Sequence, residues 1–187
     1  MWTKGRWFVL GAVVGVIALV IWSRSMGSGT LFADLVDHFP NAVQARPNRE
    51  VFVVGDVTIA GRTLKSIGVS QGSRIVWKEP IPSNAWLEVS LGVREEAWTK
   101  TGDGVLFLVA ISHPGKDGNM VYDELVSLIV NPFGNPADRQ WYPLMLDLSP
   151  YAGQEVEVIF NTRPGAGAEA NADNDLAVWG APSIVTR

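Results

Sequence analysis

Cysteine is absent from the 187 residues of this chain, and histidine occurs only twice, at His38 and His113. The absence of cysteine excludes a disulfide framework, a thiolate zinc site and a cysteine nucleophile. No GxSxG, HExxH or phosphate-binding glycine loop occurs. Two adjacent acidic pairs, Glu95-Glu96 and Asp123-Glu124, are present, but neighbouring residues of a strand point to opposite faces and do not act together. The sequence therefore predicts that this protein is not an enzyme.

Charge is unevenly divided along the chain. Residues 1–26 contain three basic and no acidic residues, a net charge of +3, whereas the remaining residues contain twelve basic and nineteen acidic ones, a net charge of -7. An acidic domain argues against nucleic acid as a partner. The length suits one membrane anchor followed by one domain.

The longest apolar run, WFVLGAVVGVIALVIW, covers residues 7–22. As a helix it would span roughly 24 Å, which is most of the hydrocarbon core of a bilayer. Lys4 and Arg6 precede the run and Arg24 alone follows it closely, so the positive-inside rule places the N-terminus in the cytoplasm and the domain on the periplasmic or extracellular face. A cleaved signal peptide fits the same pattern, but Ser23-Arg24-Ser25 is a poor cleavage site. We therefore expect a retained transmembrane helix within residues 1–26.

Small residues mark one face of this predicted helix. Gly11 and Gly15 form a GxxxG pattern, and Ala18 and Trp22 continue the same face. Small residues at this spacing let a second helix approach closely, which is how helices associate in lipid. We expect the face to pack against another membrane subunit, with ordinary exposure to membrane lipid as the alternative.

Residues 27–41 are predicted to form a short joint and an amphipathic helix next to the membrane. Thr30 can cap a helix through LFADLVDHF, which Pro40 ends. The apolar face of this helix is expected to pack on the following domain, with lipid or a partner protein as alternatives. Five residues make up that face: Leu31, Phe32, Leu35, Val36 and Phe39.

Residues 42–187 show the pattern of an all-β domain. Short apolar segments alternate with clusters of Gly, Pro, Asn and Asp, and along residues 85–93 apolar and polar side chains alternate. About eight to ten strands with such turns predict a jelly-roll β-sandwich. The strands are expected at 51–54, 56–60, 63–70, 73–79, 85–93, 104–112, 120–130, 141–147, 155–162 and 175–185.

Two stretches near the C-terminus, Arg139–Thr162 and Asp175–Val185, carry a distinctive order of motifs. A tryptophan opens a strand that ends in DLSxYAGQ, a VxVxFxT strand follows, and the chain closes on AxWGxPxI. In this order they resemble the last strands of galactose-binding-like and carbohydrate-binding-module-like jelly rolls. The resemblance implies the fold and leaves the function open, because this fold serves sugar binding, protein docking and scaffolding alike.

Hard oxygen donors gather shortly before the last predicted strand. Asn171, Asp173, Asn174 and Asp175 lie within five residues, and Asp103 lies in a GDG turn. Calcium accepts such ligands, and jelly rolls of the resembled group often carry a structural calcium. Clusters of Asn and Asp are also ordinary turn residues. A structural calcium at Asp173, Asn174 and Asp175 is therefore one of two interpretations, and no other cofactor is expected.

Sugar binding requires an exposed aromatic face with carboxylates or amides beside it. Trp98, in the segment REEAWTKTGDG, is the candidate because nearly all its sequence neighbours are polar, and Glu95 and Glu96 precede it. An exposed tryptophan can equally anchor a protein partner. The sequence leaves both alternatives open.

Two hypotheses for function follow. The first is a non-catalytic accessory subunit of a larger membrane complex, with a photosynthetic or respiratory assembly as one setting, whose anchor helix and β-domain contact other subunits. The second is a membrane-tethered carbohydrate-binding module of the cell envelope, whose ligand is a glycan. The packing face of the anchor, the short joint and the lack of a catalytic set place the first hypothesis ahead.

Overall fold

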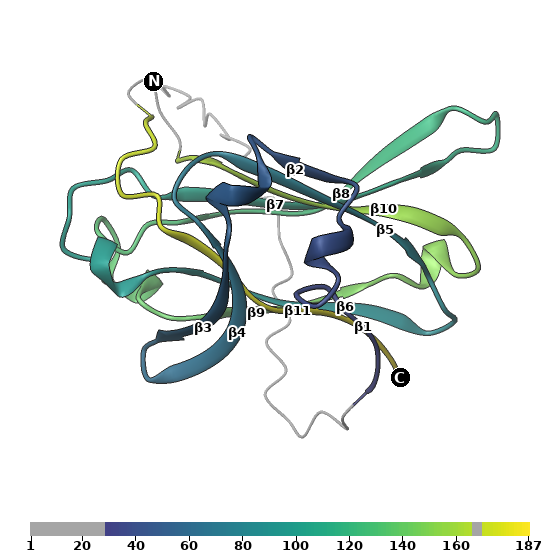
Figure 1. The fold of residues 1–187 in the computed structure, drawn as a ribbon, viewed down its shortest axis with the longest axis horizontal. Helices are drawn as coiled ribbons and strands as arrows, with labels where there is room; N and C mark the ends of the chain where they lie inside the picture. Colours follow the sequence, from purple (N-terminus) through teal and green to yellow (C-terminus); the bar gives the residue numbers. More distant parts are fainter. Residues whose placement is uncertain (1–28, 166–169) are drawn as a thin grey trace, which may run out of the picture.

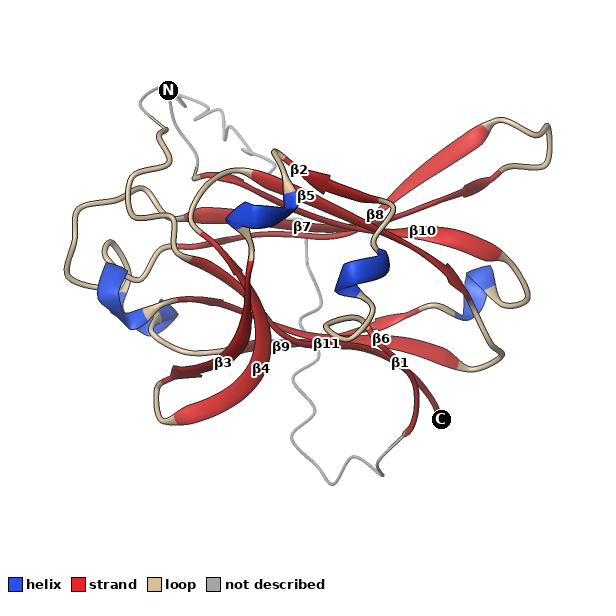
Figure 2. Cartoon of the chain, in the orientation of Figure 1, coloured by secondary structure: helices blue, strands red, loops and turns tan. Residues whose placement is uncertain are grey.

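The computed structural model describes residues 29–165 and 170–187. These residues form eleven strands, which are arranged as two stacked antiparallel sheets (Figures 1 and 2). One sheet has the strand order β3-β4-β11-β6-β9, with β1 also paired to β11, and the other has the order β2-β5-β10-β7-β8. The strands are β1 (Thr30–Asp34), β2 (Gln44–Arg46), β3 (Val53–Ile59), β4 (Arg62–Val69), β5 (Ser73–Pro80), β6 (Ala85–Val93), β7 (Val105–Pro114), β8 (Met120–Val130), β9 (Tyr142–Asp147), β10 (Glu155–Pro164) and β11 (Ala177–Thr186).

The helices of the described part are single 3-10 turns in the connections. They are η1 (Phe39–Asn41), η2 (Arg49–Val51), η3 (Glu95–Ala97), η4 (Pro136–Asp138) and η5 (Ser149–Tyr151). The predicted all-β sandwich is confirmed. The boundaries from residue 62 onward differ from the predicted strands by a few residues at most, because turn residues punctuate each strand.

The core lies between the two sheets and is built by strand alternation. Its centre is a chain of aromatic rings, in which Trp77 contacts Phe160, Phe160 contacts Trp179, and Trp179 contacts Phe107. The ring centroids are 5.0, 4.5 and 4.9 Å apart, and all four side chains are fully buried. Offset and edge-to-face pairs of this kind stabilise a core beyond the area that they bury. These rings hold the two sheets in a fixed relation.

A second apolar cluster lies on the outer side of the six-stranded sheet. Val178 points outward, because its neighbours Ala177 and Trp179 belong to the main core. The β3–β4 hairpin curls over this side of the sheet (Figure 1) and packs Ile59 against Val178 and Trp141. The indole N–H of Trp141 donates a hydrogen bond to the backbone oxygen of Arg62 at 2.9 Å. The hairpin is thereby fastened to the sandwich.

The predicted amphipathic helix within residues 27–41 is wrong. Thr30–Asp34 form strand β1, which pairs with the end of β11, and Leu31 and Phe32 are exposed instead of packed. The carboxylate of Asp34 accepts a hydrogen bond from the backbone N–H of Val36 at 2.8 Å, which closes a turn directly after the strand. Pairing with β11 outweighs the helical pattern. The sheet therefore begins at Thr30 and not after residue 41.

No helix within residues 29–165 or 170–187 has the length and apolar character required to cross a membrane. The predicted anchor over residues 7–22, with its face of Gly11, Gly15, Ala18 and Trp22, lies outside the described residues.

Candidate functional site

The outer face of the five-stranded sheet, formed by the side chains of β2, β5, β10, β7 and β8 that point away from the core, has an apolar floor. Val158 and Phe160 of β10 lie in the core, so Ile159 between them points outward. Ile159 is paired in register with Val76 of β5 on one side and with Ala110 of β7 on the other. Together with Leu108 these residues form an apolar cluster separate from the core, and all of them are buried. Outward side chains are rarely this well shielded in a two-layer sandwich, so the middle of this face is covered, and its exposed groups lie beside the floor.

A polar row crosses the four longest strands of this sheet beside the apolar floor. Glu157 of β10 is paired with Lys78 of β5 and Ser112 of β7, and Ser112 is paired with Tyr122 of β8. Tyr122 is 48% exposed. Because paired residues of neighbouring strands lie side by side on the same face, the row combines hydrogen-bonding groups with an aromatic ring at its end.

An open hollow of about 610 Å³ lies at this end of the outer face. The ammonium group of Lys78 forms an ion pair with Glu155, Nζ to Oε1 at 2.7 Å, and this contact raises the pKa of Lys78. The residues that line the hollow are Lys78, Ser112, Pro114, Met120, Gln154, Glu155, Val156 and Glu157. A ligand with many hydroxyl groups and one apolar side would find suitable partners here.

A small polar network supports the β7–β8 hairpin next to the hollow. Nε2 of His113 lies 3.0 Å from Oδ2 of Asp123, and the hydroxyl of Tyr151 donates to the same oxygen at 2.9 Å. Burial, with the hydrogen bond to Asp123, raises the pKa of Tyr151 to about 12, so the phenol stays a donor. His113 thus lies near the end of β7, where its contact with Asp123 supports the hairpin.

The acidic pair Asp123-Glu124 is divided between the two faces of β8. Asp123 pairs with core residue Ile111 and Glu124 with outward Ala110, so the two carboxylates point to opposite sides, as expected.

The structure places the predicted sugar-binding residues around η3, at a different end of the sandwich. Trp98 is half-buried and not exposed, since its ring packs against the cluster of Ile59, Trp141 and Val178. Its indole N–H donates to the backbone oxygen of Val93 at 2.9 Å. The polar residues next to Trp98 in the sequence predicted an exposed ring, but apolar residues that are distant in sequence cover it in the fold.

The two acidic residues before Trp98 are exposed. Oε1 of Glu95 accepts a hydrogen bond from the backbone N–H of Ala60 at 2.8 Å and so holds the turn between β3 and β4. No contact of the Glu96 side chain is recorded within the described residues. Ligand contact by Trp98, Glu95 and Glu96 stays a prediction, and the described contacts give Trp98 and Glu95 a role in fixing the hairpin.

The predicted metal residues lie where the β6–β7 and β10–β11 connections meet. Asp175 is only 3% exposed, and its Oδ2 atom has no hydrogen-bond partner within the described residues. Burial, with the carboxylates of Asp103 and Asp173, raises the pKa of Asp175 to about 7. Asn174 instead donates through Nδ2 to the backbone oxygen of Thr101 at 2.9 Å. Within residues 29–165 and 170–187 no three His, Cys, Asp or Glu side chains group as a metal-ligand set.

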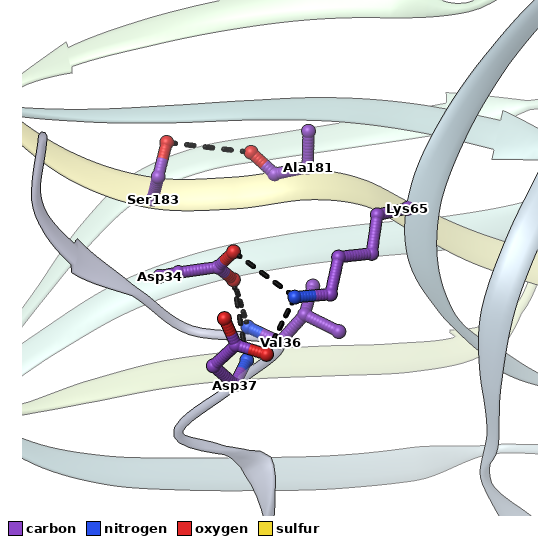
Figure 3. Close-up of polar contacts among 6 residues, drawn as sticks. All are labelled: Asp34, Val36, Asp37, Lys65, Ala181 and Ser183. Atoms are coloured by element: carbon purple, nitrogen blue, oxygen red, sulfur yellow. Dashed lines mark hydrogen bonds and ion pairs between the residues drawn. The ribbon is translucent and has the colours of Figure 1, made fainter.

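A second acidic pair shows how this fold neutralises carboxylates elsewhere. Asp34 and Asp37 both face the ammonium group of Lys65, which binds Oδ2 of Asp34 at 3.3 Å and also contacts Oδ1 of Asp37 (Figure 3). The hydrogen bond to Lys65 lowers the pKa of Asp37. This pair is satisfied by a lysine and needs no further cation.

Comparison with known proteins supports the fold. No family model matches the chain. An uncharacterized protein of Archaeoglobus fulgidus is 40% identical over 106 residues, which are 56% of this chain and 25% of that protein, so the chain spans about a quarter of this relative. Among solved structures, the CBM51 of Clostridium perfringens GH95 in complex with methyl-galactose has a TM-score of 0.52 at 16% identity over 82% of this chain and 99% of that chain.

The CBM22-1 xylan-binding domain of Paenibacillus barcinonensis Xyn10C has a TM-score of 0.49 at 12% identity, over 86% of this chain and 97% of that chain. The similarity to the CBM51 is one of fold. The described domain thus shares its jelly-roll fold with this CBM51, in agreement with the fold that the C-terminal motifs implied.

Proposed function

We propose that this protein is a non-catalytic glycan-binding module and that the outer face of its five-stranded sheet receives the sugar. The observation that carries the proposal is the polar row of Lys78, Glu157 and Ser112, which lies beside the open hollow and ends at the exposed ring of Tyr122. A pyranose has an apolar side formed by its C–H groups and a rim of hydroxyls, so it requires both kinds of surface.

The charges around the hollow favour a neutral sugar over an acidic one. Lys78 is already paired with Glu155, which leaves the carboxylate of Glu157 as the remaining charge of the lining. A carboxylate accepts hydrogen bonds from sugar hydroxyls and repels uronic acids or sulfated sugars. The CBM51 of similar fold, in complex with methyl-galactose, supports a neutral hexose as the first ligand to test.

The similarity of fold favours this hypothesis over an accessory subunit of a membrane complex. The membrane tether belongs to the proposal as well, since the apolar run at residues 7–22 would hold the module at the cell envelope. Fractionation of cells that express the full chain tests the tether. Recovery of the protein in the soluble fraction would contradict it.

A glycan array probed with the full chain in mild detergent, followed by calorimetric titration of the best ligand, tests the binding function. Tyr122→Ala should weaken binding about five- to tenfold, because a ring stacked on a sugar contributes about 1 to 1.4 kcal/mol. Phe133→Ala is the matched control, since Phe133 is similarly exposed, at 42%, and lies after the end of β8, outside the polar row.

Three outcomes decide between the alternatives. Loss of affinity in Tyr122→Ala but not in Phe133→Ala supports the proposed face. Binding that is insensitive to Tyr122 but lost in Trp98→Ala moves the site to η3, as first predicted from the sequence. Absence of binding to every glycan on a broad array, by a chain that is folded by circular dichroism, rejects the function.

A further inference from the structure

Apolar side chains gather on the outer face of the six-stranded sheet, where β1 runs beside β11. Leu31 is paired with Val185 of β11, and Val185 is paired with Trp86 of β6. Ile184, the neighbour of Val185, lies in the core, so this row points outward. Leu31 is 60% exposed, and Phe32, at the bulge after it, is 46% exposed. Leu31, Phe32, Val185 and Trp86 together form the β1 patch.

The β1 patch follows the predicted membrane anchor closely in the sequence. Six residues, 23–28, separate the end of the apolar run at Trp22 from Gly29, the residue before β1. An extended chain covers at most about 3.6 Å per residue, so Gly29 can lie no more than about 25 Å from Trp22. A Cβ atom added at Gly29 would lie 3.2 Å from Cβ of Val185, so the chain enters the domain beside the patch. An anchor in the bilayer would therefore keep the patch within reach of the lipid surface.

Two acidic side chains beside the patch have basic partners. Glu88 of β6 forms an ion pair with Arg187, Oε1 to Nη2 at 2.8 Å. Asp34 of β1 forms an ion pair with Lys65, Oδ2 to Nζ at 3.3 Å (Figure 3). A paired charge costs less to bring out of water than a bare one. These ion pairs therefore favour contact of the patch with a neutral lipid surface.

We propose that the β1 patch lies against the lipid surface of the membrane and sets the orientation of the domain. This inference rests on the membrane tether of the proposed function. A few apolar side chains bind a bilayer only weakly, but a short tether holds them at an effective concentration in the millimolar range. Aromatic rings such as those of Phe32 and Trp86 suit the interfacial region of a bilayer.

A second copy of the chain fits the β1 patch less well than lipid does. An added strand would have to pair with the edge of β1, which is only five residues long and carries a bulge between Leu31 and Ala33. Short, bulged edge strands resist pairing with another strand. A lipid surface needs no backbone pairing.

This orientation bears on the glycan-binding face. The two sheets are stacked, so their outer faces point in opposite directions (Figure 2). With the β1 patch on the lipid, the polar row that ends at Tyr122 faces away from the membrane. The proposed glycan site is then turned toward the glycans of the envelope.

Lipid quenching of a fluorophore on a single introduced cysteine tests the orientation, since the chain has no cysteine of its own. The full chain is inserted as a single copy into nanodiscs of phosphatidylcholine that contain nitroxide-labelled lipid. A label on Leu31→Cys should be quenched by the lipid, whereas a label on Ile129→Cys should be quenched by iodide in the water. Ile129 is the matched position, because it is 39% exposed and is paired with Leu106 on the outer face of the other sheet.

A charge placed in the patch should release it from the lipid. Phe32→Glu leaves the core unaltered, because Phe32 is exposed. It should lower the equilibrium constant for docking at least about fivefold, since the exposed half of the ring no longer leaves water. Iodide should then reach the label at residue 31. Ile129→Glu is the matched control and should leave lipid quenching at residue 31 unchanged.

Other results overturn the proposal. If lipid quenches both labels equally, or if iodide reaches both, the domain has no such orientation, although the tether stands. A label at residue 31 that neither quencher reaches is covered by protein, and lipid quenching that Phe32→Glu does not change comes from elsewhere. A chain that does not enter the discs rejects the tether and this inference with it. Glycan binding is measured separately in detergent, so its absence rejects the glycan site and leaves the lipid contact standing.

Discussion

Replacing Gly180 of β11 with alanine should destabilise the fold by displacing the ring of Trp141. A Cβ atom at this position would lie 2.7 Å from Cζ3 of Trp141 and 2.8 Å from Cδ1 of Leu64. Carbon atoms pack at about 3.5 to 4.0 Å, so the indole must move away from the sheet. Glycine is required here because the ring lies against the strand backbone.

The size of the effect follows from three contributions. Overpacking a filled apolar cluster costs about 1 to 3 kcal/mol, and a displaced indole would weaken the Trp141–Arg62 hydrogen bond, which is worth about 1 kcal/mol. Alanine offsets part of this, by roughly 0.5 to 1 kcal/mol, because it restricts the unfolded chain. The net loss should be about 1 to 3 kcal/mol, which lowers the melting temperature of a domain of this size by roughly 2 to 12 °C.

Thermal and urea denaturation of the full chain, followed by tryptophan fluorescence and circular dichroism, measures this loss. Gly55→Ala is the matched control, because a Cβ at Gly55 of β3 meets no atom within 4 Å. It should leave stability unchanged or slightly higher. In a Trp141→Leu background the cost of Gly180→Ala should fall by at least about 1 kcal/mol, since residues in contact do not act additively. An equal cost in both backgrounds would refute the steric argument.

Three further predictions concern polar groups. With a chelator present, the free energy of unfolding should fall by up to about 4 kcal/mol as the pH rises from about 4 to 7. The reason is that the pKa of Asp175 is about 7 in the folded chain against an ordinary 3.8. Urea denaturation across that pH range should show a flatter dependence on pH for Asp175→Asn. Lys65→Met should lower the melting temperature more at low salt than in 1 M NaCl, since the lysine contacts two carboxylates. Tyr151→Phe should cost about 1 kcal/mol in urea denaturation by removing a donor to Asp123.

Most of the fold was accessible from the sequence because the strands from β4 onward are bounded by turn residues and have regular apolar patterns. The two predicted segments at 51–54 and 56–60 are one strand, β3 (Val53–Ile59), since Gly55 lies within a paired ladder. β2 was missed because three residues are too few to show a period. β1 was missed because its pattern also fits a helix, and only its partner β11, about 150 residues later, selects the strand.

The candidate site was less accessible, because it depends on which strands become neighbours. Tyr122, Ser112, Glu157 and Lys78 are spread over about 80 residues of sequence. They form a row only through the pairing of β8, β7, β10 and β5. Trp98 drew attention because most of its sequence neighbours are polar, yet it packs against a cluster formed by Ile59 of β3, Val178 of β11 and Trp141. Local polarity predicts exposure only for a residue that no distant strand covers.

The apolar floor of the outer face corresponds to a pattern that is visible in the sequence. Val105–Pro114 is apolar on both faces over its first seven residues, a pattern that a strand inside a two-layer sandwich does not need, since one of its faces looks away from the core. Phe107 and Val109 fill the core, whereas Leu108 and Ala110 lie on the outer face with Ile159. In a sandwich of two sheets, a central strand with a second apolar face therefore indicates an outer face that is partly shielded from solvent, and the polar row with Tyr122 beside it is the part of this face that we propose to bind a glycan.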